Sequence, residues 1–305
     1  AISVQSGEYQ YGDGSHPVIA KQWHEPVASG HDSTGATEFY GGDLAGIQNR
    51  LYYLQSLGIT ALYLNPIFVS PSNHKYDTVD FYKVDPHLGS NEQLAELVSN
   101  LHQRSMRLVL DAVVDHTSDQ HPWFNKNGMG QGAFHDENSP YRRFYTFDPQ
   151  GGYVGWKGVS SLPKLDFATK EVQDIVYRAD DAILRYWLRA PYNIDGWRLD
   201  VAHMIGENGT AKGNHYHLRE MRQTMKQENP ESYMLGEHFF EASPWLQGEQ
   251  EDRAMNYYGF AHPVRAFLAG QDIRYHPIQI SAREFDQWLR AGRAQIPFAN
   301  QLAQF

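Results

Sequence analysis

The sequence contains no cysteine, so disulfide bonds and thiolate chemistry are excluded. It also lacks any apolar run near the roughly 20 residues that a membrane-spanning helix needs. Basic residues are scarce, since 26 Lys and Arg stand against 36 Asp and Glu. The net charge of −10 argues against nucleic acid and anionic membranes as partners, because an acidic surface repels phosphates. The absence of thiols fits a reducing environment, and we predict a cytoplasmic location.

What the sequence does contain is a regular alternation of helix and strand patterns, which begins at Asp43. Apolar residues three and four positions apart predict helices, and two of these begin with capping boxes, Ser90 with Gln93 and Ser281 with Glu284. Apolar, β-prone runs predict buried parallel strands. The predicted helices lie at Ile47–Leu54, Leu94–Leu101, Val172–Trp187, Leu218–Met225 and Phe285–Leu289. The predicted strands are Ile59–Phe68, Arg107–Val113, Asp195–Val201, Tyr233–His238 and Ala254–Phe260.

Repeated strand–helix units imply a parallel sheet, either closed into a barrel or open and doubly wound. No Gly-x-Gly-x-x-Gly follows a predicted strand, which counts against a dinucleotide-binding fold. We predict an α/β fold of the barrel type in four stretches. Residues 1–42 form an irregular lead-in, 43–116 the first half of the barrel, and 169–305 its continuation. Residues 117–168 hold seven Gly and four Pro without a clear helix, and predict a small irregular subdomain inserted after the third strand.

Charged residues gather at the ends of three predicted strands. The first delivers Asp111, the second Arg198 and Asp200, and the third Glu237 with His238. A barrel carries its chemistry at the carboxyl ends of its strands, so these groups should meet. Cleavage of a glycosidic bond needs two carboxyl groups in different protonation states. Arg198 should keep Asp200 ionised, whereas Glu237 should hold a proton.

Each of these residues also has an ordinary structural interpretation. A single Asp at a strand end is more often a helix cap, and Arg198 alone is more often an ion-pair partner. His116 and His238 are equally explained as polar residues with satisfied hydrogen bonds. Residue spacing by itself leaves catalysis and structure about equally favoured.

Longer motifs separate the two interpretations. Asp111-Ala-Val-Val-Asp115-His116, Gly196-Trp-Arg-Leu-Asp200-Val-Ala-His203 and Gly236-Glu237-His238 resemble three motifs of the α-amylase family of glycoside hydrolases, in family order. Leu162-Pro-Lys-Leu-Asp166 is similar to a further, accessory motif. Asn65-Pro-Ile-Phe68 and His74-Lys-Tyr-Asp-Thr78 look like the branch of neopullulanase, cyclomaltodextrinase and maltodextrin glucosidase. Phe39-Tyr-Gly-Gly-Asp-Leu44 and Leu235-Gly-Glu-His-Phe239 look most similar to maltodextrin glucosidase.

The resemblance implies a (β/α)8 TIM barrel and a retaining hydrolase of α-1,4-glucosidic bonds in maltodextrins, acting by double displacement. Asp200 would be the nucleophile and Glu237 the general acid/base. The substrate-binding and supporting residues would be Arg198, His116, Tyr76, Asp111, His203 and His238. The alternatives are a relative that acts on α-1,6 bonds or transfers glycosyl groups, and a non-catalytic binding protein on the same fold. The oligomeric state stays open.

Two departures from the family pattern matter. Asp115 stands where the first motif usually has Asn, which serves a structural calcium site in many amylases. An Asp oxygen is also a calcium ligand, but this branch often lacks the ion, and we expect no metal or other cofactor. The family's first strand and its fourth motif, with a third carboxylate, would lie before Ala1 and after Phe305. We therefore expect a partial barrel that is inactive alone, completed by residues beyond 305.

Overall fold

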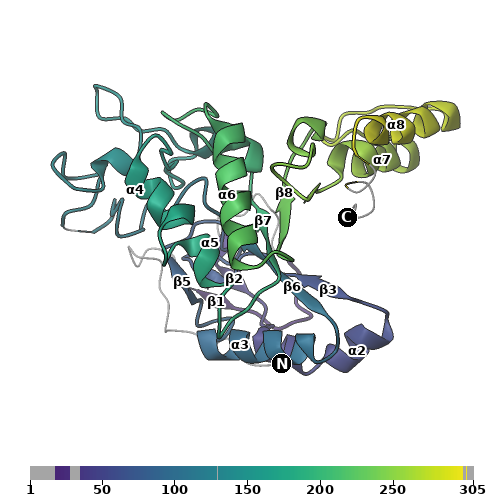
Figure 1. Ribbon diagram of the computed structural model, residues 1–305, viewed down its shortest axis with the longest axis horizontal. Helices are drawn as coiled ribbons and strands as arrows, with labels where there is room; N and C mark the ends of the chain where they lie inside the picture. Colours follow the sequence, from purple (N-terminus) through teal and green to yellow (C-terminus); the bar gives the residue numbers. More distant parts are fainter. Residues whose placement is uncertain (1–17, 28–34, 129, 298–299, 301–305) are drawn as a thin grey trace.

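A computed structural model describes residues 18–27, 35–128, 130–297 and 300. Most of the lead-in predicted for residues 1–42, and the last five residues, lie outside the described residues. The centre of the molecule is a parallel sheet in the order β3-β6-β7-β8-β9, the same order as in the chain (Figure 1). This is the strand order of part of a (β/α) barrel. Its strands are β3 (Ala61–Tyr63), β6 (Arg107–Ala112), β7 (Gly196–Leu199), β8 (Tyr233–Gly236) and β9 (Arg253–Ala254).

Helices α1 (Leu44–Gln48) and α2 (Leu51–Ser56) precede β3 in the chain, and α3 (Asn91–His102) lies between β3 and β6. Helices α4 (Lys170–Gln173) and α5 (Ile183–Tyr186) lie between β6 and β7, and α6 (Asn214–Glu228) lies between β7 and β8. A 3-10 turn at Ser243–Trp245 connects β8 to β9, after which come α7 (His262–Ala269) and α8 (Ala282–Ala294). Both predicted capping boxes are confirmed, at the starts of α3 and α8. The four apolar residues predicted to line one face of α3 are all buried: Leu94, Leu97, Val98 and Leu101. Short strands form two further pairs, β1 (Ile19–Ala20) with β2 (Glu38–Phe39), and β4 (Phe68–Val69) with β5 (Asp80–Val84).

Two of the predicted strands are wrong in extent. Ile59–Phe68 is not one strand, because only β3 joins the parallel sheet and Phe68 pairs antiparallel with Val84. Pro66 lies between the two parts and has no N–H to donate to a ladder. Ala254–Phe260 is a strand only at its first residue. Beyond it, the Asn256 side chain accepts a hydrogen bond from the Gly259 N–H and caps a π-helical turn at Tyr257–Ala261.

The long helix predicted at Val172–Trp187 is also wrong, because it is broken in the middle. After α4 the chain forms a π-helical turn at Asp174–Arg178 and then extends at Ala179 before α5 begins. The Arg189 side chain contacts the chain at this break. Its guanidinium donates to the backbone carbonyl and the carboxylate of Asp180.

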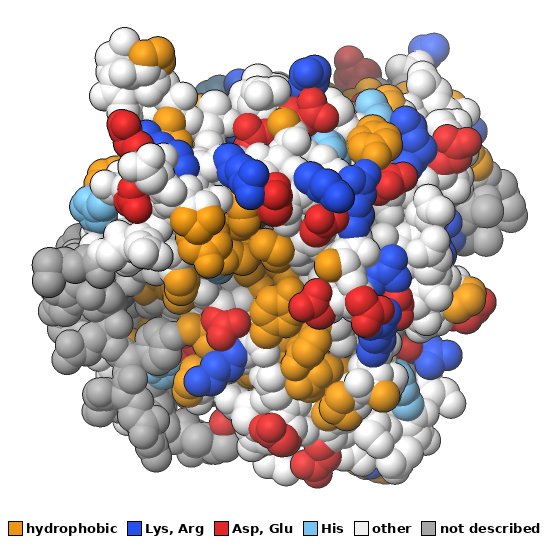
Figure 2. Space-filling model, turned by 60° about the vertical axis from the view of Figure 1, so that its left-hand side comes forward, with side chains coloured by type: hydrophobic (Ala, Val, Ile, Leu, Met, Phe, Trp, Pro, Cys, Tyr) orange, Lys and Arg blue, Asp and Glu red, His pale blue; other side chains and the backbone are white. Residues whose placement is uncertain are grey.

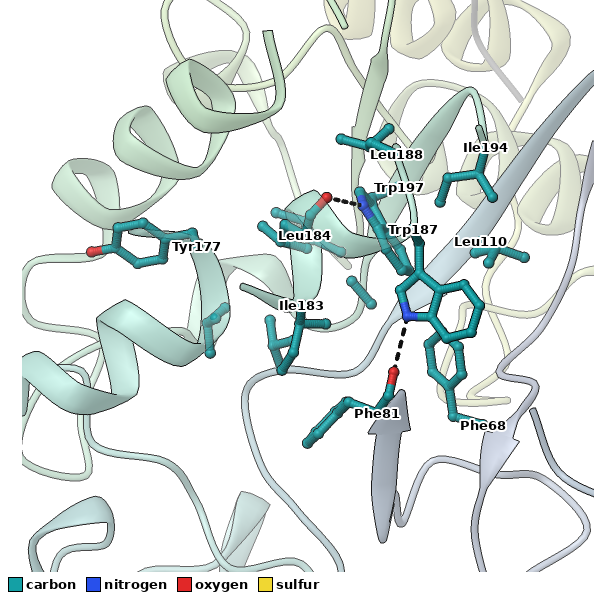
Figure 3. Packing of buried hydrophobic residues seen from close by; sticks show 14 of the residues in the cluster. Phe68, Phe81, Leu110, Tyr177, Ile183, Leu184, Trp187, Leu188, Ile194 and Trp197 are labelled. Carbon is teal, nitrogen blue, oxygen red and sulfur yellow. Dashed lines mark hydrogen bonds between the residues drawn. The ribbon is translucent and has the colours of Figure 1, made fainter. Parts of the chain in front are cut away.

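Two tryptophans join the β4–β5 hairpin to the sheet (Figure 3). Trp187 is fully buried, stacks on Phe68 with ring centroids 5.0 Å apart, and donates its indole N–H to the Phe81 carbonyl at 2.9 Å. Trp197, on β7, donates to the Leu184 carbonyl at 3.1 Å. Because each buried N–H has a partner, the rings are buried without an unsatisfied donor. This packing fixes β7 and therefore the residues at its carboxyl end.

Residues 117–168 contain two 3-10 turns, Arg142–Phe144 and Trp156–Gly158, and several isolated bridges. No α-helix occurs among the described residues of this segment. Its buried aromatic side chains belong to the same hydrophobic cluster as the sheet and helices: Phe124, Phe144, Tyr145 and Phe167. A separate inserted subdomain therefore stays a prediction.

Among the described residues, no helix has both the length and the apolar character that crossing a bilayer requires. The surface shown in Figure 2 carries basic and acidic side chains side by side, around a band of hydrophobic ones. Charges of both signs are thus interspersed over this face.

Candidate active site

The carboxyl ends of β6, β7 and β8 lie together at one edge of the sheet. Asp111 on β6 is the register partner of Arg198 on β7, so their side chains leave the sheet next to each other. Asp200 directly follows β7, and Glu237 directly follows β8. All four side chains are buried. The structure therefore brings together the charged groups that the sequence placed at separate strand ends.

The Arg198 guanidinium joins the three carboxylates. Its Nη1 lies 2.7 Å from Asp200 Oδ1 and 2.9 Å from Asp111 Oδ1, and its Nη2 lies 2.6 Å from Glu237 Oε1. Because one guanidinium fork spans only a few ångströms, the contacting oxygens of Asp200 and Glu237 lie within roughly 8 Å of each other. That limit includes the carboxyl separation of retaining glycosidases and the lower part of the range of inverting ones.

The backbone after Asp200 also holds Glu237. Val201 adopts a left-handed conformation with φ of 40°, which is costly for a β-branched residue. In this conformation its N–H donates to Glu237 Oε2 at 2.9 Å. The Glu237 N–H in turn donates to the Leu199 carbonyl at 3.1 Å. Val201, a strained residue next to Asp200, thus fixes the position of the Glu237 carboxylate.

Burial dominates the electrostatics of this cluster. It raises the pKa of Asp200 to about 7, although Arg198 opposes the shift. Burial likewise raises the pKa of Asp111, against the same guanidinium. Removal of water from the Asp200 carboxylate thus opposes the effect of Arg198, and the expectation that Arg198 keeps Asp200 ionised stays a prediction.

Two tyrosines support Asp111. The hydroxyls of Tyr63 and Tyr76 donate to Asp111 Oδ2 at 2.5 and 3.2 Å. Burial raises the pKa of both phenols, so they act as neutral donors. Tyr76 was predicted at the site and Tyr63 was not. A hydroxyl at the end of an otherwise apolar strand was the available indication, but β3 first had to be placed next to β6.

The site around Asp115 does not suit calcium. Asp115 is fully buried, and the Lys164 ammonium lies 2.6 Å from its Oδ1 while also donating to the Met204 carbonyl. His116 Nδ1 lies 3.6 Å from Asp115 Oδ2. Although burial alone has the opposite effect, His116 and Lys164 lower the pKa of Asp115, and Asp115 raises the pKa of His116. The oxygens that would bind a cation already have a positively charged partner from the chain, so the residues present do not fit the ion.

The two other predicted histidines lie behind Glu237. His203 Nδ1 is 3.1 Å from the Glu237 carbonyl, and burial lowers the pKa of His203. His238 is completely buried, and its Nε2 lies 2.9 Å from both carboxylate oxygens of Glu251. Neither residue lines the cavity described next, although both were predicted to bind substrate. Glu251 was not anticipated, because thirteen residues separate it from His238.

A cavity of about 670 Å³ opens at this edge of the sheet. Tyr76, His116, Asp200 and Glu237 line it, whereas Arg198 and Asp111 lie behind its wall. His74 and Asp77, from the His74–Thr78 motif, also line the cavity, together with residues that were not predicted at the site, among them Asp119, Gln120, Trp156 and Phe239. The Lys157 ammonium lies 4.9 Å from the Trp156 ring and 5.0 Å from the Phe239 ring. It thereby joins the 117–168 segment to the loop after β8. Two carboxyl groups in an aromatic-lined cavity are suited to acid–base and nucleophilic chemistry on a neutral polar ligand.

Comparison with known proteins gives a family for this arrangement. Residues 26–158 and 150–303 match the model of the alpha amylase catalytic domain. The intracellular maltogenic amylase of Bacillus subtilis is 40% identical over 251 residues, which are 80% of this chain and 39% of that protein. The cyclomaltodextrinase of Geobacillus thermopakistaniensis is 40% identical, covering 85% of this chain and 42% of that protein. Neopullulanase 2 of Thermoactinomyces vulgaris is 35% identical, over 96% and 46%.

Solved structures agree with the sequence comparison. The cyclic α-maltosyl-(1→6)-maltose hydrolase of Arthrobacter globiformis, in complex with that cyclic sugar, superposes with a TM-score of 0.74 at 29% identity, over 95% of this chain and 62% of its own. A cyclomaltodextrinase superposes with a TM-score of 0.73 at 32% identity, over 88% and 43%. The chain spans less than half the length of the curated relatives described above.

Proposed function

Because this chain belongs to the alpha-amylase family of glycoside hydrolases, we propose that it carries the reacting groups for retaining hydrolysis of α-1,4-glucosidic bonds in maltodextrins. The observation that supports this proposal is the arrangement around Arg198. One guanidinium holds Asp200 and Glu237 together, and both acids line the same cavity. We take Asp200 as the nucleophile and Glu237 as the general acid/base.

The proposed reaction has two displacements. In the first, the Asp200 carboxylate attacks the anomeric carbon while Glu237 gives its proton to the departing glycosidic oxygen, and a glycosyl ester forms on Asp200. In the second, Glu237 takes a proton from water as the water attacks the same carbon and releases Asp200. Tyr76 and His116, which line the cavity, hold the sugar being cleaved. Arg198 and Asp111, behind them, fix the orientation of Asp200.

Retention is tested by the configuration of the first product. Two inversions at one carbon restore the starting stereochemistry, so we expect freshly released sugar from maltotriose to be the α anomer. Proton NMR in the first minutes, before mutarotation, distinguishes the two anomers. A β product at early times would show that water attacks directly and that Asp200 is not a covalent nucleophile.

The pH dependence of the reaction follows from the burial of Asp200. The attacking form is the carboxylate, and burial raises the pKa of this group in the free protein to about 7. We therefore expect kcat/KM to fall as pH is lowered through about 7, over the range in which Glu237 holds its proton, since kcat/KM reports the free enzyme. Asp119→Asn changes another cavity carboxylate, which takes no part in the two displacements. This variant should show the same fall in kcat/KM at low pH as the wild type. A flat kcat/KM between about pH 5 and pH 8 would contradict the nucleophile assignment.

The relatives' names support the substrate class. The relatives include a maltogenic amylase, two cyclomaltodextrinases and a neopullulanase, and each of these enzymes is named for an α-glucan substrate or product. The hydrolase named for a cyclic α-(1→6)-linked maltose sugar favours a second candidate, action on α-1,6 bonds. Initial rates on maltotriose, panose and a cyclodextrin separate the candidates. We expect cleavage of maltotriose to exceed cleavage at the α-1,6 bond of panose, and the reverse order would favour the second candidate.

We further propose that the site works without a metal and that the protein acts in the cytoplasm. The contact between Lys164 and Asp115 supports the first statement, because the ammonium takes the place of an external cation. The lack of cysteine, which fits a reducing environment, supports the second. A Bacillus subtilis relative is named as intracellular.

A further inference from the structure

The buried pair of His238 and Glu251 lies directly behind the proposed general acid. We propose that Glu251 is a positioning residue, which acts through His238 and Gly236 to fix the direction in which Glu237 enters the cavity. This inference rests on the proposed function, since it assigns a role toward the reaction of Glu237. Neither His238 nor Glu251 lines the cavity, so neither is placed to touch the sugar.

Glu237 lies in the chain between Gly236, the last residue of β8, and His238. Glu251 contacts both of these neighbours of Glu237. Its carboxylate meets the His238 ring at 2.9 Å, and it fills the space beside Gly236, where an added Cβ would lie 2.1 Å from it. Any larger residue at 236 would displace Glu251 or the strand.

The chain around Glu251 is itself well anchored. The Glu251 N–H donates to the Trp245 carbonyl at 3.1 Å. Four residues further on, Met255 donates to the Gly236 carbonyl at 2.9 Å and places its Sδ 3.4 Å from Arg198 Nε. The same short segment therefore touches the strand of Glu237 and the guanidinium that holds it. A movement of Glu251 would therefore also move the strand that carries Glu237 and the Arg198 guanidinium.

The residue types of the His238–Glu251 pair favour a role in orienting Glu237 over a role in stabilising the fold. His238 and Glu251 are both completely buried, and a buried ion pair adds little net stability compared with apolar residues of the same volume. In the described part of the chain, His238 Nδ1 has no hydrogen-bond partner, which is a further cost. What an apolar pair cannot supply is a directional bond. The two contacts at Nε2 fix the ring, and with it the backbone next to Glu237.

A double-mutant cycle tests the proposal. We expect Glu251→Leu and His238→Leu each to lower the melting temperature, because each leaves one buried polar group unpaired. The double variant H238L/E251L should regain most of this loss. Its kcat on maltotriose should nevertheless stay roughly 100-fold below wild type with little change in KM, since a misplacement near 1 Å has an effect of about that size. The matched control is Glu249→Leu, an exposed carboxylate two residues away, which should leave kcat unchanged.

A double variant with the melting temperature and kcat of the wild type would overturn the proposal and leave the pair a purely structural feature. A raised KM with unchanged kcat would also overturn it, because the pair would then act on substrate binding. These variants are made in the full-length protein, with the residues beyond 305; if the proposed function itself is wrong, that protein without substitutions will fail to hydrolyse maltotriose at all. An active wild type with an equally active double variant overturns only the role of Glu251.

Two conservative variants decide the question if the double variant does not fold. Glu251→Gln keeps the length of the side chain and an acceptor for the His238 N–H, whereas Glu251→Asp keeps the charge but shortens the reach. Positioning predicts that kcat falls less in Glu251→Gln than in Glu251→Asp, with KM unchanged in both. The opposite order would mean that charge alone matters, and would contradict a positioning role.

Discussion

Changing Asp200→Asn or Glu237→Gln in the full-length protein is expected to reduce kcat on maltotriose by roughly 10⁴-fold while the protein stays folded, because groups that act together in one reaction each carry most of its rate. The two variants keep the shape of the side chains but remove the attacking carboxylate in one case and the transferable proton in the other. Both amides can still accept a hydrogen bond from Arg198. Initial rates and a thermal melt, measured on the same preparations, test this prediction.

A substrate with an activated leaving group distinguishes the role of Asp200 as nucleophile from the role of Glu237 as general acid. A glucosyl substrate with an activated leaving group, such as a fluoride, needs little help from an acid, so formation of the glycosyl ester should recover in Glu237→Gln and not in Asp200→Asn. Surface carboxylates provide matched controls. Asp286→Asn removes an exposed partner of Arg290, and Glu171→Gln removes an exposed partner of Arg143. Near-normal turnover of either active-site variant, or recovery in Asp200→Asn alone, would show that the roles are assigned wrongly.

The variant Arg198→Met is expected to lose both stability and activity. The guanidinium is the shared partner of Asp111, Asp200 and Glu237, all of which are buried. Removing one member of a buried ion pair costs about 3–5 kcal/mol in the free energy of unfolding, because a charge is left without compensation. The kcat should fall at least about 100-fold, since this guanidinium contacts both reacting acids directly.

The loss of stability should depend on pH in a defined direction. Burial raises the pKa of Asp200 to about 7 and also raises that of Asp111. A carboxyl group with a raised pKa in the folded state is easiest to bury when protonated, so its contribution to stability is greatest at low pH and is lost as pH rises through the folded-state pKa. We therefore expect Arg198→Met to be closer to the wild type at about pH 5 than at about pH 8 in urea unfolding.

Two further variants make this test specific. Arg198→Lys restores a positive charge but not the planar fork, so we expect it to recover part of the stability and little of the kcat. Arg178→Met removes a half-exposed guanidinium that pairs with Glu220 at 3.4 Å, and should change stability by less than about 1 kcal/mol. If Arg198→Met melted like the wild type at both pH values, the cluster would not depend on its guanidinium.

Local patterns predicted much of the scaffold. Both capping boxes, the buried face of α3, and strands β6, β7 and β8 follow from residues within a few positions of each other. The failures occur where contacts outside the local pattern are present. Arg189 donates to Asp180 at the break in the predicted helix Val172–Trp187, and the pairing of Phe68 with Val84 takes that residue out of the parallel sheet. Neither contact can be read from local periodicity.

The sequence by itself determined which residue types stand at the strand ends, because a strand followed by an acid is a local pattern and the motifs around Asp200 and Glu237 are short. Only the tertiary structure decided the pKa values and the ion-pair partners of these groups. Burial moved the pKa of Asp200 against the pull of Arg198, Lys164 paired with Asp115, and Glu251 came to lie behind Glu237. The physical reason is that desolvation and ion pairing depend on what surrounds a group in space, and those neighbours come from parts of the chain that no local pattern connects.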